Sequence, residues 1–134
     1  MSSIFTKIVD GEIPSFKVAE NNGFLAFLDV NPLVKGHVLV IPKQEVDYYF
    51  DLPDELMAAY SLFVKKVARA IKSVLPCKRI GVAVIGLEVP HAHTHLIPIN
   101  KINDMNFANP KLTLSEEELS VIAKSISEAF ISIE

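Results

Sequence analysis

The longest regular pattern of apolar positions along the chain lies between residues 51 and 75. Apolar residues recur there three or four positions apart, a spacing that places them on one face of a helix. Asp54 and Glu55 suit its first turn, and Pro76 suits its end. The pattern therefore predicts one long helix whose core-facing stripe is Leu56, Phe63, Val67, Ala70, Ile71 and Val74.

Two further amphipathic segments predict helices near the two ends of the chain. Residues 2–9, SSIFTKIV, predict a short helix that Gly11 ends. Another helix is predicted to begin near Ser115, because Glu118 follows three positions later and the pair forms a capping box. The apolar face of this last helix is Leu119, Ile122, Ile126 and Phe130.

Strand patterns fill the intervals between the helices. The first two predicted strands are joined at Asn21-Asn22-Gly23, a sequence typical of a hairpin turn. The third is rich in β-branched residues and is stopped by Pro42. The order of elements predicts an α+β fold with a five-stranded, mostly antiparallel sheet, one long helix and short flanking helices. The predicted strands are 16–20, 24–29, 37–42, 79–85 and 91–99.

Length and composition favour one domain that spans residues 1–134, with half of its residues apolar. A net charge of −3 gives no electrostatic reason to expect nucleic acid or an anionic membrane as the main partner. No apolar run reaches membrane-spanning length. With a single cysteine, Cys77, and no signal-peptide pattern, a cytoplasmic protein is expected.

The candidate chemistry lies in HAHTHLIP, which holds three of the four histidines of the chain at alternate positions. On a strand His91, His93 and His95 would share one face. The outer two would lie roughly 13 Å apart, too far for all three to bind one metal ion. Two alternatives stay open. The histidines could be ordinary polar residues on the surface of an edge strand, or His91 and His93 alone could bind a metal ion. A row of imidazoles also suits phosphoryl chemistry, because neutral imidazole is a nucleophile and imidazolium donates to phosphate.

The segment HAHTHLIP resembles the signature of the histidine triad (HIT) superfamily, His-x-His-x-His followed by apolar residues. Three further stretches resemble the family in the same order, and the chain is most similar to its Hint-like branch. They are IFTKIVDGEIPSFKVAE, LAFLDVNP and KGHVLVIPK. The resemblance implies a HIT-like fold and nucleoside phosphoramidase activity at the α-phosphorus of purine nucleotides.

The resemblance also implies a role for each matching position. His93 would be the nucleophile, His95 would contact the phosphate, and His91 would orient His93. His37 would complete the site, and Asp29 would bind the ribose hydroxyls, a task that suits a carboxylate. The residues that match the apolar base pocket, each of which has core packing as its alternative role, are Phe5, Ile8, Ile13, Phe27 and Val30.

Several positions depart from the family pattern. Ser3 and Thr6 stand where some bacterial relatives carry zinc-binding cysteines, and Glu45 stands where a further histidine often follows. Neither a structural metal nor another cofactor is therefore expected. Leu87 replaces a usual glutamine, and Glu88 replaces a serine or threonine. Glu88 has three possible roles, as a proton donor, as an orienting residue or as a solvent-exposed side chain.

The resemblance leaves three functional hypotheses and one assembly hypothesis. The chain is a phosphoramidase acting through a nucleotidyl-His93 intermediate, a dinucleoside polyphosphate hydrolase, or a nucleotide-binding scaffold with little turnover. Similar proteins pair through the long helix and a sheet edge, which implies a homodimer. The apolar strand that begins at Arg79 would be a hazardous exposed edge. The helix face predicted to meet the partner is Met57, Ala58, Tyr60 and Ser61.

Overall fold

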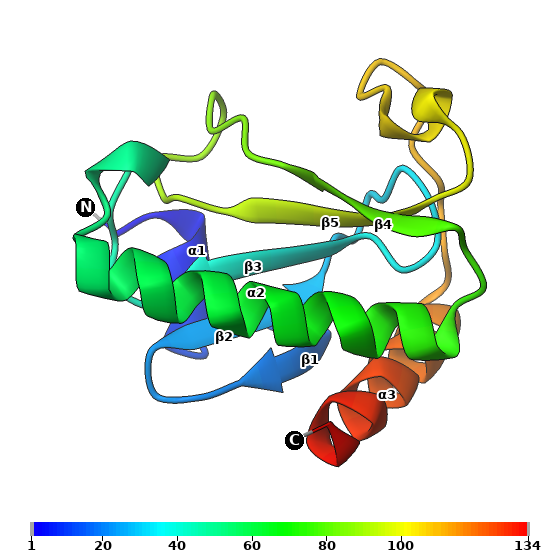
Figure 1. The fold of residues 1–134 in the computed structure, drawn as a ribbon, viewed down its shortest axis with the longest axis horizontal. Helices are drawn as coiled ribbons and strands as arrows, with labels where there is room; N and C mark the ends of the chain where they lie inside the picture. The colour runs from blue at the N-terminus through cyan, green and yellow to red at the C-terminus, as the bar shows by residue number, and fades with distance from the viewer. Residues whose placement is uncertain (1, 134) are drawn as a thin grey trace.

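A five-stranded antiparallel sheet and three α-helices make up the computed structural model, which describes residues 2–133 (Figure 1). Two short 3-10 helices lie at Tyr49–Asp51 and Ile102–Met105. The main elements in chain order are α1 (Ile4–Val9), β1 (Lys17–Glu20), β2 (Phe24–Leu28), β3 (Val38–Pro42), α2 (Asp54–Val74), β4 (Arg79–Ala83), β5 (Thr94–Ile99) and α3 (Glu116–Ser132).

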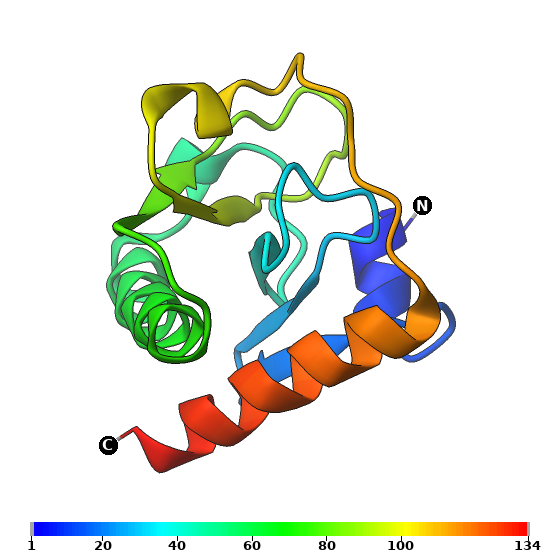
Figure 2. The same ribbon diagram turned by 90° about the vertical axis from the view of Figure 1, so that its right-hand side faces the viewer.

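The strands are ordered β1-β2-β3-β5-β4, and the helices cover both faces of the sheet (Figures 1 and 2). Alternate residues of β2 point to opposite faces. Phe24, Ala26 and Leu28 join the apolar cluster beneath α2 and α3, while Leu25 and Phe27 join a second cluster beneath α1. The predicted α+β fold is confirmed. However, α3 has 17 residues against 21 in α2, so it is not a short flanking helix.

The apolar stripe of α2 faces the sheet as predicted, with Phe63, Val67 and Ile71 buried. The assignment of Tyr60 to a partner-facing surface is wrong. Tyr60 is only 1% exposed, and its hydroxyl lies 2.6 Å from both the Val40 carbonyl oxygen and Thr94 Oγ1. Burial of an aromatic ring with its hydroxyl paired stabilises the fold, so this side chain holds α2 on the sheet.

The fifth strand begins at Thr94 and not at His91. The amide of His91 donates to Val89 O (2.8 Å) and that of Ala92 donates to Val46 O (2.7 Å), so neither amide joins the ladder with β4. The β4 ladder ends where Ala83 pairs with His95, two residues before the predicted end of that strand. The histidine row therefore runs from a loop into the start of β5.

Residues 101–114, here called the connecting segment, join β5 to α3. This segment passes over the end of the sheet beside the loop between β2 and β3 (Figure 2). The amide of Leu112 donates to Pro32 O (2.8 Å) and ties the two together. In the part of the chain that the structure describes, no helix combines the length and apolar character needed to cross a lipid bilayer.

Candidate active site

A cavity of about 440 Å³ opens beside the histidine row. Its walls come from α1, the β2–β3 loop, the loop between β4 and β5, β5 itself and the connecting segment. Eight of its lining residues carry polar or aromatic side chains: Phe5, Asp29, His37, Glu88, His93, His95, Phe107 and Lys111. The remaining lining residues are Ile4, Leu39, Ile85, Gly86, Leu87 and Val89.

Gly36 allows the chain to place His37 beneath this cavity. Its φ of 88° lies in the left-handed region that glycine adopts most readily. A Cβ atom added there would overlap Leu75 Cδ1 and would lie 3.2 Å from Pro98 Cγ. The KGH sequence thus permits a tight turn against the end of α2, after which His37 is 2% exposed.

His37 and His95 form a pair whose protonation is fixed by the backbone. The Leu33 amide donates to His37 Nδ1 (3.1 Å), so this nitrogen carries no proton. His37 Nε2 then carries the proton and donates it to His95 Nδ1, 2.9 Å away. In neutral His95 the remaining proton is therefore on Nε2. That atom is left as a donor for a group in the cavity.

Burial keeps both rings of this pair neutral. Desolvation, together with the neighbouring charges of His95 and Lys111, lowers the pKa of His37 to about 3. Desolvation, with His93 nearby, lowers the pKa of His95 to about 4. Phe107 contributes by packing edge-on against His95, with ring centroids 5.0 Å apart. His95 therefore offers a neutral N–H at physiological pH.

His91 lies below the cavity and is fully buried. Its Nε2 donates to Pro42 O (2.7 Å), so Nδ1 accepts a hydrogen bond from the Ser3 hydroxyl (2.8 Å). Burial lowers the pKa of His91, against opposing effects of the Pro42 carbonyl and Glu45. The ring is held at both nitrogens, and its backbone carbonyl faces His93.

His93 receives its orientation from that carbonyl. His93 Nδ1 donates to His91 O (2.8 Å), so in the neutral ring Nε2 carries an unshared electron pair. The ring packs edge-on against Phe5 and His95, with centroids 5.0 and 5.1 Å away. This arrangement fixes both the tautomer and the direction of His93, as a nucleophile requires.

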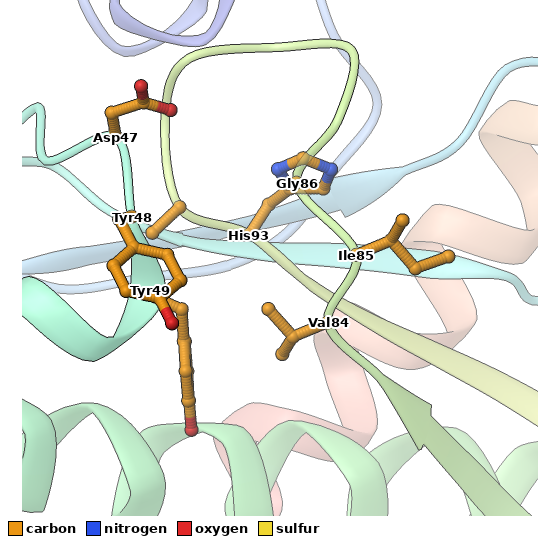
Figure 3. Close-up of a pocket in the computed structure, with 8 residues that line it drawn as sticks. Asp47, Tyr48, Tyr49, Val84, Ile85, Gly86 and His93 are labelled. Carbon is orange, nitrogen blue, oxygen red and sulfur yellow. The ribbon is translucent and has the colours of Figure 1, made fainter.

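A smaller cavity of about 170 Å³ also contacts His93, between Asp47–Tyr49 and Val84–Gly86 (Figure 3). Figure 3 shows the imidazole ring pointing away from Tyr49 and Val84. His93 thus lines both cavities, and its ring packs edge-on against that of His95, which lines the larger one.

Glu45 joins α1 to the histidine row through a bridge of hydrogen bonds with Ser3 and Thr6. Its Oε1 accepts from the Ser3 amide (2.7 Å) and the Thr6 hydroxyl (2.6 Å), while Ser3 also caps α1. The Ser3 amide and the Thr6 hydroxyl lower the pKa of Glu45 and favour its ionised form. Ser3 therefore connects an exposed carboxylate to His91.

Asp29, His37 and His95 place three potential metal-ligand atoms within 4.8 Å of one another. The hydrogen bonds oppose metal binding there. His37 Nε2 carries the proton of its ring, and moving that proton to Nδ1 would set it against the Leu33 amide. His95 Nδ1 is occupied as the acceptor from His37. The ring nitrogens of His37 and His95 that face each other are thus engaged in hydrogen bonds and are not free to bind a metal ion.

The HIT domain model matches residues 10–102, which include all four histidines. This chain belongs to the HIT family. It is 39% identical over 130 residues to a Schizosaccharomyces pombe protein named adenosine 5′-monophosphoramidase hnt1, covering 95% of this chain and 97% of that protein.

Solved HIT structures agree with this fold over nearly the whole chain. A Hit-like protein involved in cell-cycle regulation from Bartonella henselae, with an unknown ligand, has a TM-score of 0.82 and 32% identity, covering 96% of both chains. A zinc-bound histidine triad family protein from Mycobacterium smegmatis has a TM-score of 0.79 and 26% identity, covering 98% of this chain and 95% of that chain.

The HIT fold brings most of the predicted site residues together, but not all of them. Phe5, Asp29 and Glu88 line the larger cavity with His37, His93 and His95. Among the residues predicted to form the base pocket, Ile8 and Phe27 are buried beneath the cavity, Ile13 packs at the margin of the same cluster, and Val30 is 52% exposed. Leu87 is 88% exposed at the cavity rim.

Sequence reasoning missed Phe107 and Lys111 in this HIT protein. Both lie in the connecting segment, which follows the last strand and has no regular hydrophobic period. The sequence did offer one signal, an isolated aromatic residue and a lysine in a segment with three asparagines and one proline. Such composition indicates a loop but not which surface the loop will cover.

Proposed function

We propose that this HIT protein is a nucleotide hydrolase or transferase that acts at the α-phosphorus of nucleoside phosphoramidates through a nucleotidyl-His93 intermediate. One observation carries the proposal. The hydrogen bond from His93 Nδ1 to His91 O leaves the Nε2 electron pair free beside the predicted N–H of His95. A nucleophile and a donor for phosphoryl oxygen therefore lie side by side.

In the proposed reaction His93 Nε2 forms a bond to the α-phosphorus and the phosphorus–nitrogen bond to the amine breaks. The amine leaves with a proton, and we assign Glu88 to that transfer because it lines the same cavity. Water then attacks the phosphorus, the bond from phosphorus to His93 breaks, and the proton that the water loses returns to Glu88. The nucleoside monophosphate departs, and His93 returns to its neutral form.

The nucleoside would be held by Asp29, which borders the histidine pair, and by the apolar wall of the cavity. Asp29 has its Oδ1 fixed by the Asn31 amide (2.9 Å), while its Oδ2 lies 3.7 Å from His37 Nε2. Oδ2 is thus the atom that we assign to the ribose hydroxyls. Phe5, Leu39 and Val89 supply apolar surface for a purine.

A comparison of two substrates tests this proposal. We expect turnover of an adenosine phosphoramidate at a kcat/KM at least tenfold above that for a diadenosine polyphosphate, measured by chromatography of released AMP. The reverse preference would identify a dinucleoside polyphosphate hydrolase. Calorimetric binding of AMP without turnover of either substrate would identify a nucleotide-binding scaffold and would contradict the enzymatic assignment.

We also propose that two copies pair through α2 and β4. In a single chain the outer edge of β4 has no neighbouring strand among the described residues. Val82 on β4 is 59% exposed and Leu62 on α2 is 69% exposed, so pairing would cover apolar surface and an open edge. Light scattering should report a dimer at tens of micromolar, and a monomer would contradict the proposal.

A further inference from the structure

The connecting segment contributes a cation to the larger cavity. Lys111 lines that cavity together with two acidic residues, Asp29 and Glu88. The imidazoles of His37 and His95 are neutral at physiological pH, so this pair does not supply the positive charge that Lys111 brings to the cavity. Without it, the ionisable side chains around the cavity would repel an anionic nucleotide.

The ammonium group of Lys111 is held in place by its own segment. Its Nζ donates to Phe107 O (2.6 Å) and to Asn109 O (3.3 Å). An ammonium group has three N–H bonds, so one donor is left for a further partner. Among residues 2–133, no carboxylate lies within 4.0 Å of this nitrogen. The charge is positioned, but it is not neutralised by an ion pair.

The charge acts on the histidine side of the cavity. Burial raises the pKa of Asp29, and the charge of Lys111 opposes that rise. The same segment places Phe107 against His95, and the Leu112–Pro32 hydrogen bond fixes the segment beside the β2–β3 loop. Lys111 is therefore near the residues to which we assign the phosphate and the ribose.

We infer that Lys111 is a substrate-binding residue that recognises the negative charge of the phosphoryl group and so selects nucleotides over nucleosides. This inference rests on the proposed function. His95 would supply a neutral hydrogen bond to the phosphoryl group, and Lys111 would supply the charge that balances it. The connecting segment, which lies mostly outside the residues matched by the HIT domain model, would then set substrate preference.

Calorimetric titrations of AMP and adenosine test the inference. In Lys111→Gln we expect AMP affinity to fall about two- to fivefold, an effect typical of one exposed ion pair, with adenosine affinity unchanged. Lys111→Arg should restore most of the affinity for AMP. Lys124→Gln is the matched control, because Lys124 is an exposed lysine on α3. Salt should weaken AMP binding more in the wild type than in Lys111→Gln.

Two outcomes would overturn the inference alone. Unchanged affinity for both AMP and adenosine in Lys111→Gln would show that the Lys111 charge does not contribute to nucleotide recognition. An equal loss for both ligands would assign Lys111 to the nucleoside or to the fold. If the wild type binds neither ligand, both the inference and the proposed function fail, so the two failures are distinguishable.

Discussion

Replacing His93 with alanine should lower kcat for an adenosine phosphoramidate by roughly 10⁴-fold or more, as loss of a nucleophile does in other enzymes. The physical reason is that no other described nitrogen in the cavity has a free electron pair. His37 Nδ1 and His95 Nδ1 both accept hydrogen bonds. AMP affinity should change little, because Asp29, Lys111 and the apolar wall hold the ligand independently.

The measurement is steady-state turnover together with rapid quenching and peptide mass analysis of the HAHTHLIP segment. The wild type should carry a nucleotidyl group on His93, and His93→Ala should carry none. His37→Ala is the comparison variant, and it should cost less than His93→Ala since His37 supports His95 and attacks nothing. A His93→Ala variant with near-normal kcat and no adduct in the wild type would refute the mechanism.

The second-largest effect is expected at His95. His95→Ala should lower kcat by about 10²- to 10³-fold, the usual cost of removing a donor aimed at developing negative charge. His95→Gln should recover part of the loss, because its amide can also donate a hydrogen bond. Thermal unfolding of each variant separates this effect from loss of the fold. An equal loss in both variants at wild-type stability would mean that hydrogen bonding by His95 is unimportant.

The dependence of kcat on acidic pH provides an independent check on the neutral state of His95 in the His37–His95 pair. Because the pKa of His95 is about 4, its ring stays neutral from pH 8 down to about pH 5. Protonation of His95 should therefore affect turnover only as the pH approaches 4. A wild-type decline near pH 6.5 that disappears in His95→Gln would contradict the assigned neutral state.

Most of the fold could be predicted from the sequence because local residue patterns determine where its helices and strands lie. The α2 stripe, the capping box at Ser115 and the positions of the strands along the chain all depend on short-range spacing. Tyr60 was misplaced although its spacing put it on the stripe, four residues after Leu56 and three before Phe63. Tyr60 can be buried because its hydroxyl finds hydrogen-bond partners on β3 and β5.

The missed parts of the candidate site depend on contacts between distant segments. The start of β5 is set by the Ala92–Val46 hydrogen bond, which spacing within HAHTHLIP cannot reveal. Lys111 reaches the cavity because Leu112 is tied to Pro32, about 80 residues earlier in the chain. The tautomers of the four histidines follow from backbone partners for His37, His91 and His93, and from the His37 ring for His95. Residue types were readable from the sequence, and their orientations were not.

The hydrogen-bond bridge between Ser3, Thr6 and Glu45 determines how the N-terminal helix becomes attached when the chain folds. By resemblance to the family, Ser3, Thr6 and Glu45 stand at the positions of zinc ligands in some relatives. In this chain one carboxylate oxygen of Glu45 holds the N-terminal helix in place. Attachment of that helix therefore depends on the negative charge of Glu45. Through Ser3, the orientation of the His91 ring depends on it as well. We therefore expect this corner to assemble without a metal ion, whereas strong acid would protonate Glu45 and weaken the bridge.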